Sequence, residues 1–187
     1  NRKRTELQES FKDYSEYLKS LEMKAVIAPF EKMYIPRIAQ LTNKSNQFNL
    51  TTKRYTPDDI EKTANDSSNI TLYGRLEDKF GDNGIVSLVI GKQDGEELHI
   101  DLWLMSCRVL KRDMEFAMMD MLAKKASERG IKTVYGYYYP TAKNKMVKDF
   151  YSLQGFELVK EDEEGNKTYK LDLTGYTNKN NVIDVED

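Results

Sequence analysis

The sequence predicts an α/β (α+β) fold, in which helices flank a mixed central sheet of about seven strands. Along most of the 187 residues, apolar runs of strand length alternate with stretches whose apolar residues repeat at helical spacing. Their order is strand, two helices, three antiparallel strands, helix, strand, helix and two strands. Turns that contain Gly, at 81–84, 94–95 and 164–166, join consecutive strands directly, as in antiparallel hairpins.

The start of the chain is charged and carries apolar residues three or four positions apart. This spacing predicts a helix with one apolar face, which is formed by Leu7, Phe11, Tyr14, Leu18 and Leu21. The face either packs on the domain that follows or connects it to a domain upstream. Because position 1 is Asn rather than Met, we expect a fragment of a longer protein and assign residues 1–22 to a helical interdomain connector.

The main domain is expected to span residues 23–175. Its first strand, near 24–27, ends at a proline. The helix that follows has Pro36 in its first turn, where the missing N–H costs no hydrogen bond. A second helix begins at Thr56, which is suited to cap it, and has Pro57 at its first position.

The second half of the domain continues the alternation. The expected elements are strands at 70–76, at 85–90 and up to Cys107, a helix stopped by Gly130, a strand at 131–139, a helix at 144–153 and a hairpin from Phe156 onward. Residues 176–187 are polar and rich in Asn, which predicts a loosely held tail.

The composition excludes several classes of function. With 29 basic and 31 acidic residues, the chain lacks the basic field expected of a nucleic-acid-binding protein. A single Cys and a single His exclude an internal disulfide and a Cys/His zinc site, and we expect no metal site. No apolar run reaches the roughly 20 residues of a membrane span. We expect a cytoplasmic protein without membrane contact.

The only cysteine, Cys107, lies where a strand leads into a helix. Arg108, Lys111 and Arg112 follow it. Nearby cations and a helix start both favour the thiolate form, so this thiol is a candidate nucleophile. The alternative is a small apolar residue at the end of a core strand, because unpaired Cys is among the most buried residue types.

Asn144 and Tyr151 lie seven residues apart, and Tyr151 belongs to the run Asp-Phe-Tyr-Ser-Leu-Gln-Gly-Phe156. This pattern, together with the order of elements over residues 23–173, resembles the GNAT acyltransferase superfamily. In the last motif of that superfamily the Asn contacts the pantetheine arm, and the Tyr is the general acid toward the departing thiolate. The resemblance therefore implies that Asn144 binds substrate and that Tyr151 is catalytic.

The loop before the predicted central helix departs from the superfamily pattern. Members generally carry Gln or Arg followed by glycines three and five residues later, so that backbone N–H groups approach the diphosphate of coenzyme A. Here those positions hold Leu110, Asp113 and Glu115. Two carboxylates would repel a diphosphate, so we expect acetyl-CoA to bind weakly if at all.

Four further motifs, in order along the chain, resemble the C-terminal domain of FkbH-like proteins. They are Asn46-Gln-Phe-Asn-Leu-Thr-Thr-Lys-Arg-Tyr55, Phe80-Gly-Asp-Asn-Gly84, Ser106-Cys-Arg-Val109 followed by Arg112 and Glu115, and Pro140-Thr-Ala-Lys-Asn144. That family joins a phosphatase-like domain of the haloacid dehalogenase (HAD) superfamily to an acyltransferase-like domain. It loads a glyceryl unit from 1,3-bisphosphoglycerate onto an acyl carrier protein, toward methoxymalonyl or tetronate units of polyketides.

The resemblance implies that this chain is the acyltransferase domain of such an enzyme. Cys107 would take the glyceryl group as a thioester and pass it to the phosphopantetheine thiol of the carrier protein. The domain would bind no cofactor of its own, and Mg would belong to the HAD domain, which is expected upstream. An arm tethered to a carrier protein lacks the adenosine diphosphate of coenzyme A. The glycines that admit the diphosphate would therefore not be needed.

The other expected site residues would bind substrate. Arg54 and Arg108 suit a carboxyl or phosphate oxygen. Roughly 20 Å of strand separates Asp101 from Cys107, so Asp101 cannot act as a base for the thiol. We expect it instead to orient a side chain of segment 46–54. The full substrate-binding set is Asn46, Gln47, Asn49, Thr51, Thr52, Arg54, Asp101, Ser106, Arg108, Thr141 and Asn144. His99, a lone histidine, is left out of the site.

Cations near two predicted helix starts are expected to form a basic rim that attracts an acidic carrier protein. They are Arg108, Lys111, Arg112, Lys143, Lys145 and Lys148. The alternative is that they are ordinary solvated helix ends.

Two other functions are compatible with the sequence. A non-catalytic module would only dock the carrier protein beside the active site of the other domain, and a conventional N-acetyltransferase would use acetyl-CoA to modify a small amine. The chemistry of the Cys107 thiol separates the first alternative from catalysis. Micromolar binding of acetyl-CoA would favour the second.

Overall fold

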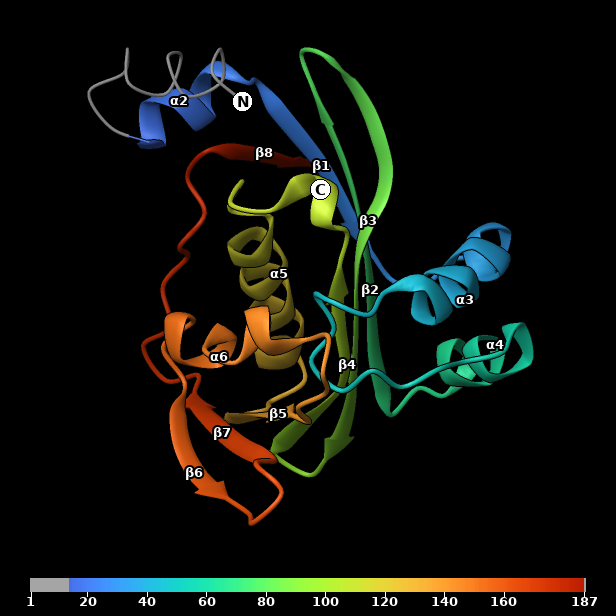
Figure 1. The fold of residues 1–187 in the computed structure, drawn as a ribbon, viewed down its shortest axis with the longest axis vertical. Coiled ribbons are helices and arrows are strands. Elements are labelled where there is room, and N and C mark those ends of the chain that lie inside the picture. Colours follow the sequence, from blue (N-terminus) through green and yellow to red (C-terminus); the bar gives the residue numbers. More distant parts are fainter. Residues whose placement is uncertain (1–13, 187) are drawn as a thin grey trace.

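Eight strands form one mixed sheet in the order β6-β7-β5-β4-β3-β2-β1-β8. The structure, a computed structural model, describes residues 14–186 (Figure 1). The strands are β1 (Met23–Ala28), β2 (Asn69–Asp78), β3 (Gly81–Asp94), β4 (Glu97–Met105), β5 (Thr133–Tyr138), β6 (Glu157–Glu161), β7 (Lys167–Asp172) and β8 (Ile183–Glu186). The β4–β5 and β1–β8 pairs are parallel, and the other neighbours are antiparallel.

Helices cover both faces of this sheet. They are α2 (Tyr14–Ser20), α3 (Ile35–Lys44), α4 (Pro57–Asn65), α5 (Met114–Glu128) and α6 (Phe150–Leu153). The α3–α4 pair lies on one face, and α5 and α6 lie on the other (Figure 1). Within the described residues, no helix has the length and apolar character needed to cross a membrane.

The strands alternate between two apolar cores. Successive side chains of a strand point to opposite faces, so in β4 Leu102 and Leu104 pack in the core under α3 and α4, whereas Trp103 and Met105 pack in the core under α5. Both faces of the central strands are therefore buried, which explains their nearly continuous apolar sequence.

Local signals explain where the first two long helices begin. The Thr56 hydroxyl accepts a hydrogen bond from the Asp59 N–H at 3.1 Å, and the Asp59 carboxylate accepts one from the Thr56 N–H at 3.0 Å. This reciprocal capping box satisfies two N–H groups that have no partner within the helix. Helix α3 carries Pro36 in its first turn, as expected.

Helix α2 packs on this domain. Its Leu18, and Leu21 just beyond it, are buried in the same core as α5. The Tyr14 hydroxyl donates a hydrogen bond to the Lys111 carbonyl oxygen at 2.6 Å. The rest of the expected apolar face, Leu7 and Phe11, lies outside the described residues.

Two elements differ from the expected fold. The helix expected at 144–153 divides into a 3₁₀ turn at Lys145–Val147 and the short helix α6. Its buried residues still recur at helical spacing, so periodicity revealed the buried face but not the break in the backbone.

The expected loose tail instead supplies the eighth strand. In β8, residues 183–186 pair in parallel with residues 23–26 of β1. Ahead of β8, the Asp120 carboxylate accepts hydrogen bonds from the Tyr176 hydroxyl at 2.6 Å and from the N–H groups of Lys179 and Asn180, both at 2.9 Å. The polar composition that predicted a loosely held tail therefore provides the groups that attach this segment to α5.

Candidate functional site

Cys107 lies in a 3₁₀ turn, Cys107–Val109, directly after β4. Its side chain is exposed, and its sulfur donates to Gln47 Oε1 at 3.3 Å. The N–H of the preceding Ser106 donates to the Val86 carbonyl oxygen at 2.7 Å, which fixes the turn to β3. Cys107 is therefore not the buried apolar residue of the alternative interpretation, and a thiol in this position is accessible to a reagent.

Ser106 and Arg108 hold the same turn together. The Ser106 hydroxyl accepts hydrogen bonds from the N–H and the Nε–H of Arg108, at 3.3 and 3.2 Å. Arg108 also donates from Nη2 to the Asn83 carbonyl oxygen at 3.2 Å. The guanidinium is exposed, so it lies beside the thiol but is already used to brace the loop.

Segment 48–50 fills the space between β4 and β5. These strands pair from residues 97–99 to residues 133–135. Beyond this region, the N–H of Leu50 donates to the Trp103 carbonyl oxygen and the N–H of Met105 donates to the Phe48 carbonyl oxygen, both at 3.0 Å. On the other side, the N–H of Tyr139 donates to the Leu50 carbonyl oxygen at 2.9 Å. Backbone groups at the diverging ends of β4 and β5 are thus paired by the chain itself.

Most of the predicted substrate-binding side chains of segment 46–54 form hydrogen bonds within that segment or to helix α3. Asn49 is fully buried, donates to the Ser45 carbonyl oxygen at 3.1 Å and accepts from the Thr52 N–H at 2.9 Å. Arg54 donates to the carbonyl oxygens of Thr42 and Ser45 and to Asn46 Oδ1. Thr52 has a positive φ of 52° and donates to the Thr51 carbonyl oxygen. Their placement shapes the loop and leaves few of these groups for a ligand.

Asp101 lies on the face of β4 opposite α5. Its carboxylate pairs with Lys53, accepts a hydrogen bond from the Tyr55 hydroxyl at 2.7 Å and lies 3.8 Å from Lys92 Nζ. Burial alone would raise the pKa of Asp101, but the bonds from Lys53 and Tyr55 hold it below its usual value. Thr51 donates to the Asp101 carbonyl oxygen at 2.8 Å. Asp101 thus orients a side chain of segment 46–54, namely Lys53, and is remote from Cys107.

Asn144 forms its hydrogen bonds inside the fold. It is fully buried, its Nδ2 donates to the carbonyl oxygens of Asn49 and Tyr139 at 2.9 and 3.0 Å, and its Oδ1 accepts from the Thr141 N–H at 2.8 Å. The Thr141 hydroxyl in turn accepts from the Asn144 N–H at 3.1 Å. The implied contact of Asn144 with a pantetheine arm is therefore not available, because these bonds join β5 to segment 48–50.

Tyr151 also lies away from solvent. It is 1% exposed, and its ring fits against Gly136, where an added Cβ would lie 2.5 Å from a ring carbon. Burial raises the pKa of the Tyr151 hydroxyl above its usual value, which makes it a weaker acid. The hydroxyl is not at the surface near Cys107, so this arrangement does not support the role of general acid implied by the resemblance.

An apolar cavity of about 400 Å³ opens between the start of α5 and α6. Met105 and Leu110, which precede and follow Cys107 in the chain, both line it. The other lining residues are Phe48, Lys111, Glu115, Phe116, Met146, Val147, Asp149, Phe150, Leu153 and Gln154. The thiol is therefore within three residues of the wall of a cavity large enough for a small organic chain.

Two carboxyl groups lie at the start of α5, where the superfamily pattern has glycines. Burial raises the pKa of Asp113, and it raises the pKa of Glu115 to about 6. Asp113 has a left-handed backbone with φ of 67°, a conformation that glycine adopts more readily. The loop therefore keeps a backbone shape suited to glycine but presents carboxyl groups.

The expected basic rim is present in part. Lys111 lines the cavity, and Lys143, Lys145 and Lys148 are exposed along the segment that leads into α6. None of these four lysines forms an ion pair with another residue between 14 and 186. Arg112 differs from the prediction, because it pairs with the buried carboxylate of Asp78 at 2.7 Å.

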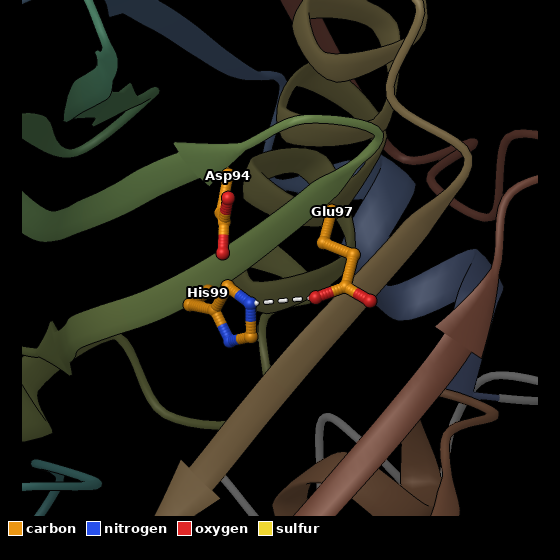
Figure 2. Close-up of side chains that lie close together, drawn as sticks. All are labelled: Asp94, Glu97 and His99. Atoms are coloured by element: carbon orange, nitrogen blue, oxygen red, sulfur yellow. Dashed lines mark hydrogen bonds and ion pairs between the residues drawn. The ribbon is translucent and has the colours of Figure 1, made fainter.

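His99 belongs to a separate cluster near the β3–β4 turn. Figure 2 shows it with Asp94 and Glu97, whose ligand atoms and those of His99 lie within 4.8 Å of one another. One ring nitrogen lies 2.6 Å from the Tyr137 hydroxyl and the other 3.1 Å from Glu97 Oε1. Both nitrogens are therefore engaged, and coordination of a metal by His99 would break one of these bonds.

The structure brings together fewer of the predicted residues than the sequence indicated. The exposed Gln47, Cys107 and Arg108 form one group with the half-buried Ser106, whereas Asn49, Asn144 and Tyr151 are buried and Asp101 lies on another face. Sequence reasoning missed Phe48 and Gln154 as cavity residues. The signal for Gln154 was its spacing from Val147, Phe150 and Tyr151, which places a polar residue at a buried position of one helical face.

Comparison with solved structures identifies the fold. An acetyltransferase of the GNAT family from Streptococcus pneumoniae superposes with a TM-score of 0.61 and 14% identity, covering 79% of this chain and 98% of that one. The GNAT domain of PAT from S. lividans gives 0.60 and 17%, with 78% and 89% covered. The PaiA N-acetyltransferase from Thermoplasma acidophilum, in complex with coenzyme A, gives 0.57 and 13%, with 80% and 99% covered.

These similarities establish a GNAT-like α/β fold, with a mixed sheet of eight strands and five helices in the described residues. At such low identity they establish the fold alone. No protein-family profile matches the sequence. No curated protein is detectably similar to it.

Proposed function

We propose that this chain is an acyltransferase domain that carries an acyl group as a thioester on Cys107 and passes it to the thiol of a phosphopantetheine arm. The observation that carries the proposal is the exposed thiol of Cys107, in a turn flanked along the chain by Met105 and Leu110, which both line an apolar cavity at the start of α5. A reactive thiol needs access, and a flexible arm needs an apolar slot. The loop between β4 and α5 holds the thiol and contributes Leu110 and Lys111 to the cavity wall.

The proposed chemistry consists of two exchanges. The Cys107 thiol loses its proton to solvent, and the sulfur attacks the acyl carbon of the donor. A C–S bond forms, and the bond from that carbon to phosphate or to the donor sulfur breaks. The thiolate of the arm then attacks the same carbon and releases Cys107. Exchange between thioesters is near balance, so the protein mainly has to position the two sulfurs.

The finer identity of the substrates follows from the resemblance to FkbH-like proteins. On that basis the acyl group is a glyceryl unit derived from 1,3-bisphosphoglycerate, and the arm belongs to an acyl carrier protein. The exposed Lys143, Lys145 and Lys148 support an acidic partner, because their charges are unpaired within the described chain. A HAD-type domain that holds Mg would supply the activated glyceryl group.

Intact-mass measurement tests the covalent step. The chain is incubated with the glyceryl thioester of pantetheine, quenched in acid and weighed. We expect one glyceryl adduct on the wild type and none on Cys107→Ala. We also expect the adduct to disappear when a carrier protein with a free phosphopantetheine thiol is added.

The same chain unfolded in urea is the matched control, because it keeps the thiol but loses its surroundings. Equal labelling of the folded and unfolded chains would mean that the site contributes nothing. An adduct that persists in Cys107→Ala would assign the intermediate to another residue. A folded chain that is never labelled would favour the docking module instead.

A conventional acetyl-CoA-dependent transferase is the second candidate, favoured by the similarity to a structure in complex with coenzyme A. Calorimetric titration with acetyl-CoA separates it from the first. We expect no micromolar binding, because the diphosphate would meet Asp113 and Glu115.

A further inference from the structure

The segment Phe80-Gly-Asp-Asn-Gly84 contains the one Asn-Gly pair of the 187-residue chain, Asn83-Gly84. Glycine has no Cβ, so its nitrogen is the least hindered of all residues in approaching the side-chain amide of a preceding Asn. Between Asp82 and Ile85, β3 has one residue more than the facing part of β2, so the pair lies in a β-bulge. The proposed acyl transfer does not use this segment.

The bulge leaves room for a reaction between these two residues. The Asn83 side chain forms no hydrogen bond with any residue between 14 and 186. Gly84 has a φ of 69°, and apart from its chain neighbours no atom of the described residues lies within 4 Å of the position that a Cβ would occupy there. The Asn83 amide is therefore free to turn toward the Gly84 nitrogen, and water can enter beside it.

Asp82 lies where a proton has to be removed. The Gly84 N–H donates to Asp82 Oδ1 at 2.7 Å, which forms an Asx turn. The other oxygen, Oδ2, accepts from Arg75 Nη2 at 3.0 Å, so the carboxylate is held in place. An amide nitrogen attacks a carbonyl carbon only as it loses its proton, and a carboxylate in contact with that N–H is suited to be the general base.

Arg108 contacts the other end of the same pair. Its Nη2 donates to the Asn83 backbone carbonyl oxygen at 3.2 Å. In a cyclic imide formed by Asn83 and Gly84, this carbonyl is one of the two that water can attack. A guanidinium at its oxygen stabilises the negative charge that develops during the attack. Ring opening at this carbonyl gives isoaspartate, whose free α-carboxylate then forms a charge-assisted bond with Arg108.

We propose that Asn83 is a site of spontaneous conversion to isoaspartate, with Asp82 as the base for ring closure and Arg108 as the group that directs ring opening. This inference goes beyond the proposed function and does not depend on it. Because Arg108 also braces the Cys107 turn, the conversion changes its partner from a neutral carbonyl oxygen to a carboxylate.

The conversion needs only water as a co-reactant. The Gly84 nitrogen attacks Cγ of Asn83, a C–N bond closes the succinimide, and the side-chain nitrogen leaves as ammonia with the proton that Asp82 removed from Gly84. Water then adds to the imide carbonyl that was the backbone carbonyl of Asn83. The bond from that carbon to the Gly84 nitrogen breaks, and the main chain now runs through Cγ.

Peptide mapping by mass spectrometry measures the conversion. The full chain is kept at pH 7.5 and 37 °C, and samples are digested and analysed by electron-transfer fragmentation, which distinguishes isoaspartate from aspartate. We expect Asn83 to convert earlier than every other Asn of the chain, with isoaspartate as the main product. Asn83→Gln should not convert, because its ring closure would need a larger imide.

Two variants test the neighbouring groups. Asp82→Ser keeps an acceptor for the Gly84 N–H but removes the carboxylate, so it should slow the loss of Asn83 about tenfold. Arg108→Gln removes the charge beside the backbone carbonyl, so it should lower the share of isoaspartate in the product. Glu77→Gln is the matched control and should change neither, because Glu77 is an exposed carboxylate opposite Asp82 on β2 that does not contact Gly84.

The chain unfolded in urea is the reference, and this comparison needs no substitution. Conversion of Asn83 in the unfolded chain but not in the folded chain would overturn the inference, because the fold would then protect the pair. Faster conversion of Asp82→Ser would show that the bond to Asp82 restrains the Gly84 nitrogen rather than activating it. A share of isoaspartate that Arg108→Gln left unchanged would remove Arg108 from the reaction.

Discussion

Burial of the Glu115 side chain disfavours the charged form of its carboxyl group. Glu115 is the second residue of α5, one of its carboxylate oxygens is buried without a partner among residues 14–186, and burial raises its pKa to about 6 from an ordinary value of 4.5. The folded state therefore holds a proton on Glu115 between these pH values, where the unfolded chain does not. The free energy of unfolding therefore decreases as the pH rises from 4.5 to about 6.

The variant Glu115→Gln should accordingly be more stable than the wild type at pH 7. A shift of this size corresponds to about 2 kcal/mol in the free energy of unfolding. The difference should shrink as the pH falls through 6 and should be gone below 4.5. Urea unfolding followed by circular dichroism across this range measures it.

Glu128→Gln, on the exposed end of the same helix, should stay within about 0.5 kcal/mol of the wild type throughout. A Glu115→Gln gain that did not depend on pH would contradict the assignment to ionisation. It would point instead to a change in packing.

The C-terminal segment 176–186 is attached to α5 through one side chain, in addition to its strand pairing and its buried Val182 and Ile183. Asp120 of α5 accepts hydrogen bonds from Tyr176, Lys179 and Asn180, and β8 then continues the sheet beside β1. Hydrogen bonds to a carboxylate are stronger than those between neutral groups. The attachment of this segment should therefore depend on Asp120 more than on the short strand itself.

Asp120→Ala should release this segment. We expect faster amide hydrogen exchange in residues 176–186 and at the β8-facing edge of β1, with a loss of about 2 kcal/mol in the free energy of unfolding. Hydrogen exchange read by mass spectrometry measures the first effect, and urea unfolding measures the second. Lys124→Ala, at an exposed position of the same helix, is the control, and unchanged exchange in 176–186 for Asp120→Ala would show that β8 holds by itself.

At the scale of the whole molecule, one sheet serves two cores. Adjacent residues of β4 belong to different cores, as Trp103 and Leu104 show. If either helical layer unfolded, it would expose the apolar side chains of strands that also pack against the other layer. The domain should therefore unfold in one step.

Trp103, the single tryptophan, reports on the α5–α6 side because it is fully buried and packs on Phe150 with ring centroids 4.7 Å apart. Its fluorescence and the far-ultraviolet circular dichroism should give the same urea midpoint. An earlier fluorescence transition would mean that the α5–α6 layer separates first, together with the cavity.

Local signals predicted much of the fold from the sequence. The capping box at Thr56, the proline in the first turn of α3 and the strands around the Gly-containing turns depend on neighbouring residues, so their effect can be read along the chain. One exception was β8, because four residues of strand gain their stability from a partner 160 positions earlier, Met23 for Ile183.

The candidate site divides in the same way. The sequence by itself determined that the chain has one thiol, that carboxyl groups stand at Asp113 and Glu115, and that cations surround them. Only the tertiary structure decided that Asn144 and Asn49 form their hydrogen bonds inside the fold, that Tyr151 is buried, and that Gln154 lines the cavity between α5 and α6. Residue type sets which hydrogen bonds a group is able to make, but the packing of distant segments sets which of them remain for a ligand.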